Sequence, residues 1–196
     1  MKKMVSFAWL LILVAVAFRP DHCLAKRRAP APATAAAQSN DNNIDLIHKT
    51  CALTEDFHQC VALLQSDPGS LTADQKGLAR IMLNIALREA KNAESDVKEL
   101  LKDPSLNPAI KQCFLTCVNV YELASTVYIP ATINSVNSDS YADARKEGSD
   151  AFTSIQTCGR DLYKAGGSSK EPAVLDKNKF VASIATLSLG IIYQLG

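Results

Sequence analysis

The arrangement of cysteines constrains the fold of this 196-residue chain more than any other feature. Cys51 and Cys60 lie nine positions apart, and each stands in a short stretch with the apolar spacing of a helix. The polar run "TEDFHQ" separates the two stretches. A disulfide between these cysteines would close a small hairpin that has too little core to hold its own shape. The sequence therefore predicts a disulfide-closed helical hairpin.

The first residues are typical of a secretory signal peptide. Lys2 and Lys3 precede an almost entirely apolar run over residues 5–18, which is shorter than the roughly 20 residues of a membrane-spanning helix. Small residues near Ala25 offer a cleavage site. We therefore assign residues 1–25 to a signal peptide and expect a secreted protein, in which disulfides persist. An uncleaved signal anchor is the alternative.

The remaining chain divides into a leader and one domain. Residues 26–43 carry prolines, alanines and polar residues without apolar periodicity, which predicts a disordered leader. Residues 44–196 have the length of a single domain. The chain has 21 basic and 20 acidic residues, and the signal peptide removes three and one of them, so 18 and 19 remain. No basic patch stands out, and we expect no nucleic-acid partner.

The apolar spacing is helical from residue 44 onwards. Four amphipathic segments cover residues 71–103, 108–133, 141–162 and 180–195, and turn signals separate them. Four such helices with short connections predict an up-down four-helix bundle. The expected fold is therefore all-α, an up-down four-helix bundle preceded by the hairpin.

Some positions have specific expected roles. Thr72 and Gln75 fit a capping box at the start of the first long helix, and Pro130 is expected to kink the second. In the last segment we expect an inward-facing stripe that consists of Phe180, Ile184, Leu187, Ser188, Ile191 and Leu195.

Signal cleavage removes Cys23 and leaves an odd number of cysteines, so two bridges would leave one thiol unpaired. Cys113 and Cys117 lie four apart on one helix. Their Cβ atoms should be about 5–6 Å apart, whereas a disulfide needs about 3.5–4.5 Å. Cys158 can reach one of them, which leaves Cys51 and Cys60 as the local pair. Spacing alone leaves other pairings open.

Four segments together resemble the plant invertase and pectin methylesterase inhibitor family, most of all its branch named "putative invertase inhibitor". They are "IHKTCALTEDFHQCVALLQSDPGSLTAD", "LNPAIKQCFLTCVNVYELA", "YADARKEGSDAFTSIQTC" and "LDKNKFVASIATLSLGIIYQL". The resemblance covers residues 44–196 and implies the same fold, a hairpin followed by a bundle. It also implies that the cysteine of the C-x₃-Y motif, Cys117, pairs with Cys158. Cys113 would then be a free thiol.

The resemblance implies a secreted, apoplastic or cell-wall inhibitor (with the vacuole as an alternative location) that is monomeric when free. Its expected partner is acid invertase (β-fructofuranosidase), whose substrate cleft it would block in a one-to-one complex. Pectin methylesterase is the alternative target. No catalytic residue, metal or cofactor is expected.

The target contacts are less well defined. Some invertase inhibitors carry Pro-Lys-Phe where this chain has Asp139-Ser140-Tyr141. Pectin methylesterase inhibitors often carry several acidic residues after the cysteine of the C-x₃-Y motif, and this chain has only Glu122 there. Asn119, Glu122 and Ser125 are the candidate contacts, expected to be exposed on the helix that carries the C-x₃-Y motif. An ordinary solvated helix face is the alternative.

Two other classes of protein were weighed. An enzyme would need a base beside a nucleophile, and near Asp56 and His58 nothing marks a nucleophile. A lipid-anchored protein would use the small residues "GGSSK" and the apolar tail that follows. However, Ser183, Thr186 and Gln194 lie off the apolar stripe of that tail, so a bundle helix is the preferred interpretation, and no membrane partner is expected.

Overall fold

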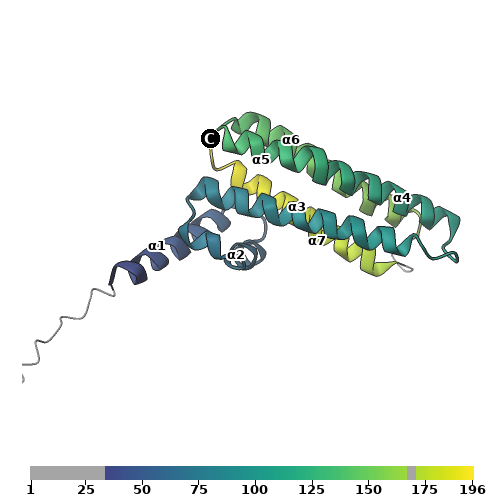
Figure 1. Ribbon diagram of the computed structural model, residues 1–196, viewed down its shortest axis with the longest axis horizontal. Coiled ribbons are helices and arrows are strands. Elements are labelled where there is room, and N and C mark those ends of the chain that lie inside the picture. Colours follow the sequence, from purple (N-terminus) through teal and green to yellow (C-terminus); the bar gives the residue numbers. More distant parts are fainter. Residues whose placement is uncertain (1–33, 167–170) are drawn as a thin grey trace, which may run out of the picture. The chain divides into compact units, whose positions relative to one another are not determined.

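The computed structural model describes residues 34–166 and 171–196, with side chains from residue 43 onwards. All regular elements in these ranges are helices, which confirms the all-α class (Figure 1). The predicted signal peptide and residues 26–33 of the predicted leader lie outside the described ranges.

The elements are α1 (Thr34–Cys51), α2 (Phe57–Gln65), the 3₁₀ turn η1 (Pro68–Thr72), α3 (Gln75–Leu100), α4 (Pro108–Leu123), the π-helical segment η2 (Ala124–Tyr128), α5 (Ile129–Asn137), α6 (Tyr141–Lys164) and α7 (Pro172–Ile192).

The structure corrects the predicted extent of the leader. Helix α1 begins at Thr34, whereas residues 26–43 were expected to be disordered. The upstream part of the helix contains the run "TAAAQ", and alanine has the highest intrinsic helix propensity of all residues. The prediction of disorder is therefore wrong for residues 34–43.

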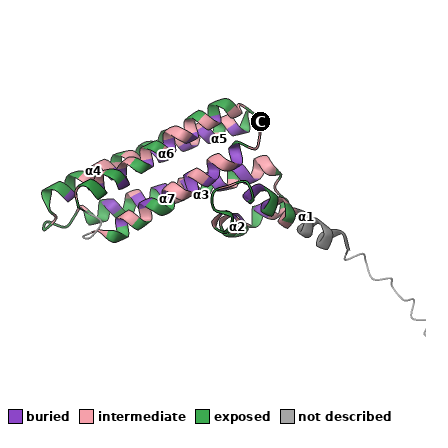
Figure 2. Ribbon diagram, turned by 180° about the vertical axis from the view of Figure 1, so that it is seen from behind, coloured by how far each residue is buried: buried purple, intermediate pink, exposed green. Residues whose placement is uncertain are grey.

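Four helical rods form the predicted up-down bundle. Helix α3 packs against α4 and α7, and α6 packs against α4, α5 and α7. Buried residues line the faces that the helices turn towards one another (Figure 2). Leu187 and Ile191 are buried in this core as expected. Phe180 is 37 % exposed, and Leu195 lies beyond the end of α7 and is only partly buried, so the apolar stripe of the last helix is shorter than predicted.

The start of α3 uses a different cap from the predicted one. Thr72 belongs to η1, and Gln75 is the first residue of the helix. Asp74 is the N-cap, and its carboxylate accepts a hydrogen bond from the Gly77 backbone N–H at 2.7 Å. The predicted capping box, with Thr72 as the N-cap, is therefore wrong. Thr72 is part of the 3₁₀ turn, so α3 begins two residues later than a Thr72 cap would require.

Pro130, which was expected to kink the second rod of the bundle, is the second residue of α5, and the rod continues from α4 through η2 into α5. The π-helical turn ends at Tyr128, two residues before the proline. Proline lacks a backbone N–H and its ring needs space in the preceding turn, and a widened turn provides that space. Thr126 Oγ1 donates to the carbonyl oxygen of Glu122 at 2.6 Å, which gives this carbonyl a partner inside the irregular region.

A buried polar cluster links three helices at one level of the bundle. The hydroxyl of Tyr121 on α4 accepts a hydrogen bond from Asn178 Nδ2 on α7 at 2.9 Å. Asn178 Nδ2 also donates to the backbone carbonyl of Ile155 on α6 at 2.8 Å. Burial raises the pKa of Tyr121 to about 12, against a smaller opposing effect of the Asn178 hydrogen bond, so the phenol stays neutral. The amide of Asn178 has room because Gly159 of α6 has no side chain.

The hairpin of α1 and α2 is fastened to the bundle by polar contacts. Gln59 Nε2 donates to Ser183 Oγ of α7 at 2.9 Å. Gln194 Nε2 donates to the carbonyl oxygen of Thr50 at 3.0 Å, and Gln194 Oε1 accepts from Gln75 Nε2 at 3.0 Å. These bonds join the hairpin to both α3 and the end of α7, so it is part of the domain.

Two glycines of α6 test the buried cluster. In Gly159→Ala the added methyl would overlap Oδ1 of Asn178, whose amide is held by two hydrogen bonds. We expect a loss of about 1–3 kcal/mol in the free energy of unfolding, measured by urea denaturation.

Gly148→Ala is the matched control, because its methyl would come closest to Cδ2 at the flexible end of the Leu189 side chain, at 2.9 Å, and would otherwise make ordinary van der Waals contacts. Alanine is also the better helix former, so its effect should stay within about 1 kcal/mol. Equal destabilisation by both changes would mean that the cluster has no special role.

Candidate functional site

The outer surface of α4 and η2 is exposed and nearly uncharged. Between Pro108 and Asn137 the only charged residues are Lys111 and Glu122. Protein interfaces are depleted of charged residues at their centre, and exposed apolar groups that cluster often mark them. The exposed residues that form this α4–η2 face are Leu115, Asn119, Glu122, Leu123, Thr126 and Val127.

Large aliphatic groups give the α4–η2 face its apolar character. Leu115, Leu123 and Val127 are 42 %, 40 % and 49 % exposed, respectively. These residues were not among the predicted contacts, although apolar residues that lie off the inward stripe, in a segment with only two charged residues, were a usable signal. The carboxylate of Glu122 has no close ion pair or hydrogen bond with any described residue. The pKa of Lys98 is raised mainly by its hydrogen bond and ion pair with Glu94, and the charge of Glu122 adds a smaller contribution.

The structure separates the three candidate contact residues. Asn119 and Glu122 are exposed, as expected. Ser125 is only 3 % exposed, and its hydroxyl donates to the carbonyl oxygen of Glu122 at 3.3 Å, so the expectation that it is exposed is wrong. The cause is η2, whose wider turn brings both Ala124 and Ser125 to the inner side of the rod. Segments of π-helix are frequently found at functional sites.

The five cysteines of the described chain lie in two places. Cys51 and Cys60 are joined in the hairpin with a Cα–Cα distance of 5.6 Å. Cys117 and Cys158 are joined between α4 and α6 with a Cα–Cα distance of 4.5 Å. Cys113 is the free cysteine.

The thiol of Cys113 is half-buried and donates to the carbonyl oxygen of Asp161 at 3.4 Å. Partial burial and, to a smaller extent, the charge of Asp161 raise the pKa of this thiol. Because the thiolate is the reactive form, the position favours an inert thiol that packs as a small apolar residue.

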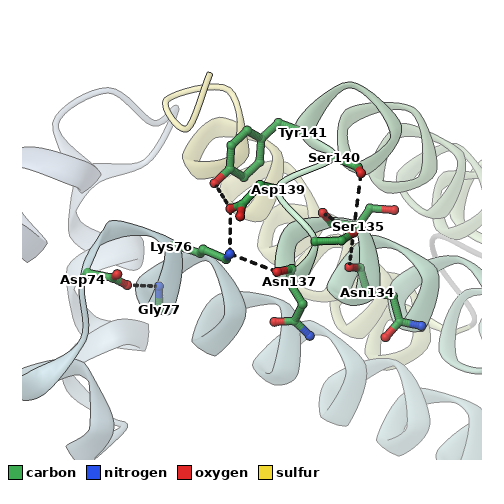
Figure 3. A network of polar contacts seen from close by, with 10 residues as sticks. Asp74, Lys76, Gly77, Asn134, Ser135, Asn137, Asp139, Ser140 and Tyr141 are labelled. Carbon is green, nitrogen blue, oxygen red and sulfur yellow. Dashed lines mark hydrogen bonds and ion pairs between the residues drawn. The ribbon is translucent and has the colours of Figure 1, made fainter.

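The turn between α5 and α6 carries Asp139-Ser140-Tyr141 and is tied to α3 (Figure 3). Lys76 Nζ forms an ion pair with Asp139 Oδ1 at 2.6 Å and donates to the carbonyl oxygen of Asn137 at 3.0 Å. The Tyr141 hydroxyl donates to the same Asp139 oxygen at 2.5 Å. Hydrogen bonds from Lys76 and then Tyr141 lower the pKa of Asp139. These residues therefore hold the turn in place.

The residues weighed for catalysis have structural roles. The Asp56 carboxylate caps α2 by accepting from the Gln59 backbone N–H at 2.9 Å. The rings of His48 and His58 each lie edge-on to Phe57, with centroids 5.8 Å and 5.4 Å away. Within the described ranges, no cluster of His, Cys, Asp or Glu side chains could hold a metal ion. None of the helices described there is long and apolar enough to span a membrane.

A disulfide-braced bundle with an exposed helix face that carries little charge has the features of a binding protein. The chain belongs to the plant invertase/pectin methylesterase inhibitor family, whose model matches residues 45–191. Members of this family inhibit enzymes and are not enzymes themselves, which confirms the expected class. The family is extracellular or belongs to the cell wall or vacuole.

Individual relatives extend over most of the chain. A "Putative invertase inhibitor" of Platanus acerifolia is 29 % identical over 158 residues, which cover 78 % of this chain and 86 % of the relative. The "Cell wall / vacuolar inhibitor of fructosidase 2" of Arabidopsis thaliana is 29 % identical and covers 56 % of this chain and 60 % of the relative. The solved structure of a mutant form of a pectin methylesterase inhibitor from Arabidopsis superposes with a TM-score of 0.64 at 20 % identity. The superposition covers 74 % of this chain and 94 % of that chain, which supports a shared fold.

The ion pair of the α5–α6 turn predicts a pH-dependent stability. The pKa of Asp139 is lower in the folded protein than its ordinary value of 3.8. Its contribution is therefore present above about pH 4 and is lost as the pH falls through the folded value. We expect Asp139→Asn to lower the melting temperature at pH 7, and this deficit should shrink as the pH falls from about 4 towards about 2.

Asp139→Ala separates charge from backbone effects. Asp139 has a φ of 60°, a conformation that asparagine tolerates better than alanine. The alanine variant should therefore be less stable than the asparagine variant at both pH values. A deficit of Asp139→Asn that stays constant with pH would contradict a role for the charge.

Alkylation tests the pairing of the cysteines. Labelling of unfolded, unreduced protein that comprises residues 26–196 should modify Cys113 alone, because the other four described cysteines are bonded. Peptide mapping by mass spectrometry identifies the labelled residue, and labelling after reduction is the control that should modify all five. Label on Cys117, with Cys113 bonded to Cys158, would overturn the pairing.

Proposed function

We propose that the protein inhibits an acid invertase by forming a one-to-one complex that blocks the substrate cleft of the enzyme. The observation that carries this proposal is the likeness to proteins named as invertase inhibitors over 78 % of the chain. Two relatives are also named as inhibitors of fructosidase, which is the same type of target. No covalent step is required, because occupation of the cleft is enough to exclude substrate.

Pectin methylesterase is the second candidate target. A "Pectinesterase inhibitor 28" of Oryza sativa subsp. japonica is 36 % identical, but over only 67 residues, or 34 % of this chain. The similar solved structures, at 20 % and 19 % identity, support the fold and leave the target open.

The α4–η2 face is the surface we propose for target binding. It offers Leu123 and Val127 for burial, with Asn119 and Glu122 as polar contacts beside them. A face on a disulfide-braced bundle is ordered before binding, so little conformational entropy is lost when the complex forms. Ser125 is left out of the proposed contacts because its side chain is buried.

The sparse charge of this face bears on pH dependence. Acid invertases are active at an acidic pH. Ordinary Asp and Glu side chains have pKa values of about 4, so they are partly protonated at such a pH. An interface that depends on ionised carboxylates would weaken there. Because Glu122 is the only carboxylate of the face, we propose that inhibition changes little between about pH 4 and about pH 7.

Inhibition and complex formation test the target directly. Purified acid invertases and pectin methylesterases are each mixed with the secreted protein, and residual activity is measured across the same pH range. Size-exclusion chromatography of the mixtures should give a one-to-one complex with an invertase. Inhibition of pectin methylesterases alone would favour the second target, and no complex with several enzymes of both classes would refute the inhibitor function.

Alanine substitutions test the docking face. Leu123→Ala and Val127→Ala should each raise the inhibition constant about 5- to 30-fold, because central apolar contacts in interfaces contribute about 1–2 kcal/mol. Leu100→Ala is the matched control, since Leu100 is 38 % exposed and Leu123 is 40 % exposed, and Leu100 lies on α3 outside the face. Equal effects of the changes at Leu100 and Leu123 would argue against a specific face.

A further inference from the structure

A cavity of about 320 Å³ lies between α3, α4 and α7. This size is about ten times the ~30 Å³ that a water molecule occupies in the liquid, and it falls in the range of small-molecule pockets, which often form between the helices of bundles. The lining includes Ala93 and Val97 of α3 and Ala173 and Val174 of α7, whose small side chains leave space between the two helices. Its lining residues are Ala93, Asp96, Val97, Glu99, Leu100, Tyr121, Ala173, Val174 and Lys177.

The interior of the cavity is apolar and firmly built. Ala93, Val97 and Val174 are buried members of the bundle core. Tyr121 also lines the cavity, and its hydrogen bond with Asn178 keeps the ring in place. An apolar body, such as an aromatic ring or a short alkyl chain, would therefore find a preformed space of matching chemistry.

The charges around the cavity leave one carboxylate without a partner. Lys177 is engaged by Glu89 at 3.1 Å, and Glu99 is engaged by Lys102 at 2.5 Å. Asp96 is exposed on the same lining and has no ion pair or hydrogen bond with the rest of the described chain. Burial raises the pKa of Glu89, but hydrogen bonds from Lys177 and Arg88 outweigh this effect and lower it, so the pair with Lys177 stays ionised at neutral pH.

We propose that this cavity is a binding site for a small molecule that has an apolar body and a single cationic amine. The apolar body occupies the space beside Tyr121, and the ammonium group pairs with Asp96. A carboxylate ligand is disfavoured, because Asp96 and Glu99 would repel it while Lys177 is already paired. The site shares no residue with the α4–η2 face, so it stands or falls independently of the inhibitor function.

The test uses 2-phenylethylamine as the probe and 3-phenylpropionate as the probe of opposite charge. Titration of the ¹⁵N-labelled secreted protein should give saturable shifts of backbone amides near the cavity with the amine only. The melting temperature should also rise with the amine concentration, because a ligand that binds only the folded state stabilises it. No saturable shift with the amine, or equal binding of both probes, would overturn the proposal.

Two variants with matched controls locate the site. Ala173→Phe should abolish binding, because the phenyl ring would fill the cavity. Ala109→Phe is the matched control and should leave binding unchanged. Both alanines are exposed, and each follows the proline that begins its helix. Asp96→Asn should weaken binding about threefold to fivefold, the effect of one partly solvated ion pair. Asp143→Asn, which removes an exposed carboxylate from α6, should leave it unchanged. Unaltered binding by Ala173→Phe would exclude this cavity.

Discussion

The contact between α4, α6 and α7 around Tyr121 holds the bundle in one arrangement. The Cys117–Cys158 bridge joins α4 to α6, and one helical turn further along α4 the Tyr121 hydroxyl accepts a hydrogen bond from Asn178 of α7. An unpaired buried polar group is costly, so the two side chains specify which residues of the helices lie opposite one another. Apolar packing alone would tolerate several relative shifts of the helices.

This fixed arrangement determines what the bundle exposes. Helix α4 packs against α3 and α6, which leaves its outer side free, and this side carries apolar groups and little charge. The widened turn of η2 shapes the same surface, because it moves Ser125 inwards and leaves Leu123, Thr126 and Val127 exposed. The proposed docking face is thus a product of the core packing, of Pro130 and of the small number of charged residues on α4 and η2.

The hairpin joins the bundle through apolar packing of Ile47 and Leu64, which are buried members of the core, and polar bonds reinforce this contact and hold the α5–α6 turn. Gln59 and Gln194 connect the hairpin to α7 and α3, and Lys76 connects the turn to α3. The turn stands where some invertase inhibitors carry Pro-Lys-Phe, yet here its residues bond within the domain. For this reason we propose the α4–η2 face, and not this turn, as the docking surface.

The sequence by itself determined the helical class, the number of long helices and the closed hairpin, because apolar periodicity and cysteine spacing are local properties of the chain. It also predicted that Asn119 and Glu122 are exposed. It could not determine that Asp74 caps α3, that α1 begins at Thr34, or that Ser125 is buried. The Asp74 cap depends on the 3₁₀ turn before α3. The start of α1 depends on helix extension upstream of the hairpin, and the burial of Ser125 depends on the π-helical turn before Pro130. These are local irregularities that apolar periodicity does not reveal. Only the tertiary structure decided the Asn178 contact and the cavity, because both arise where segments far apart in the sequence meet.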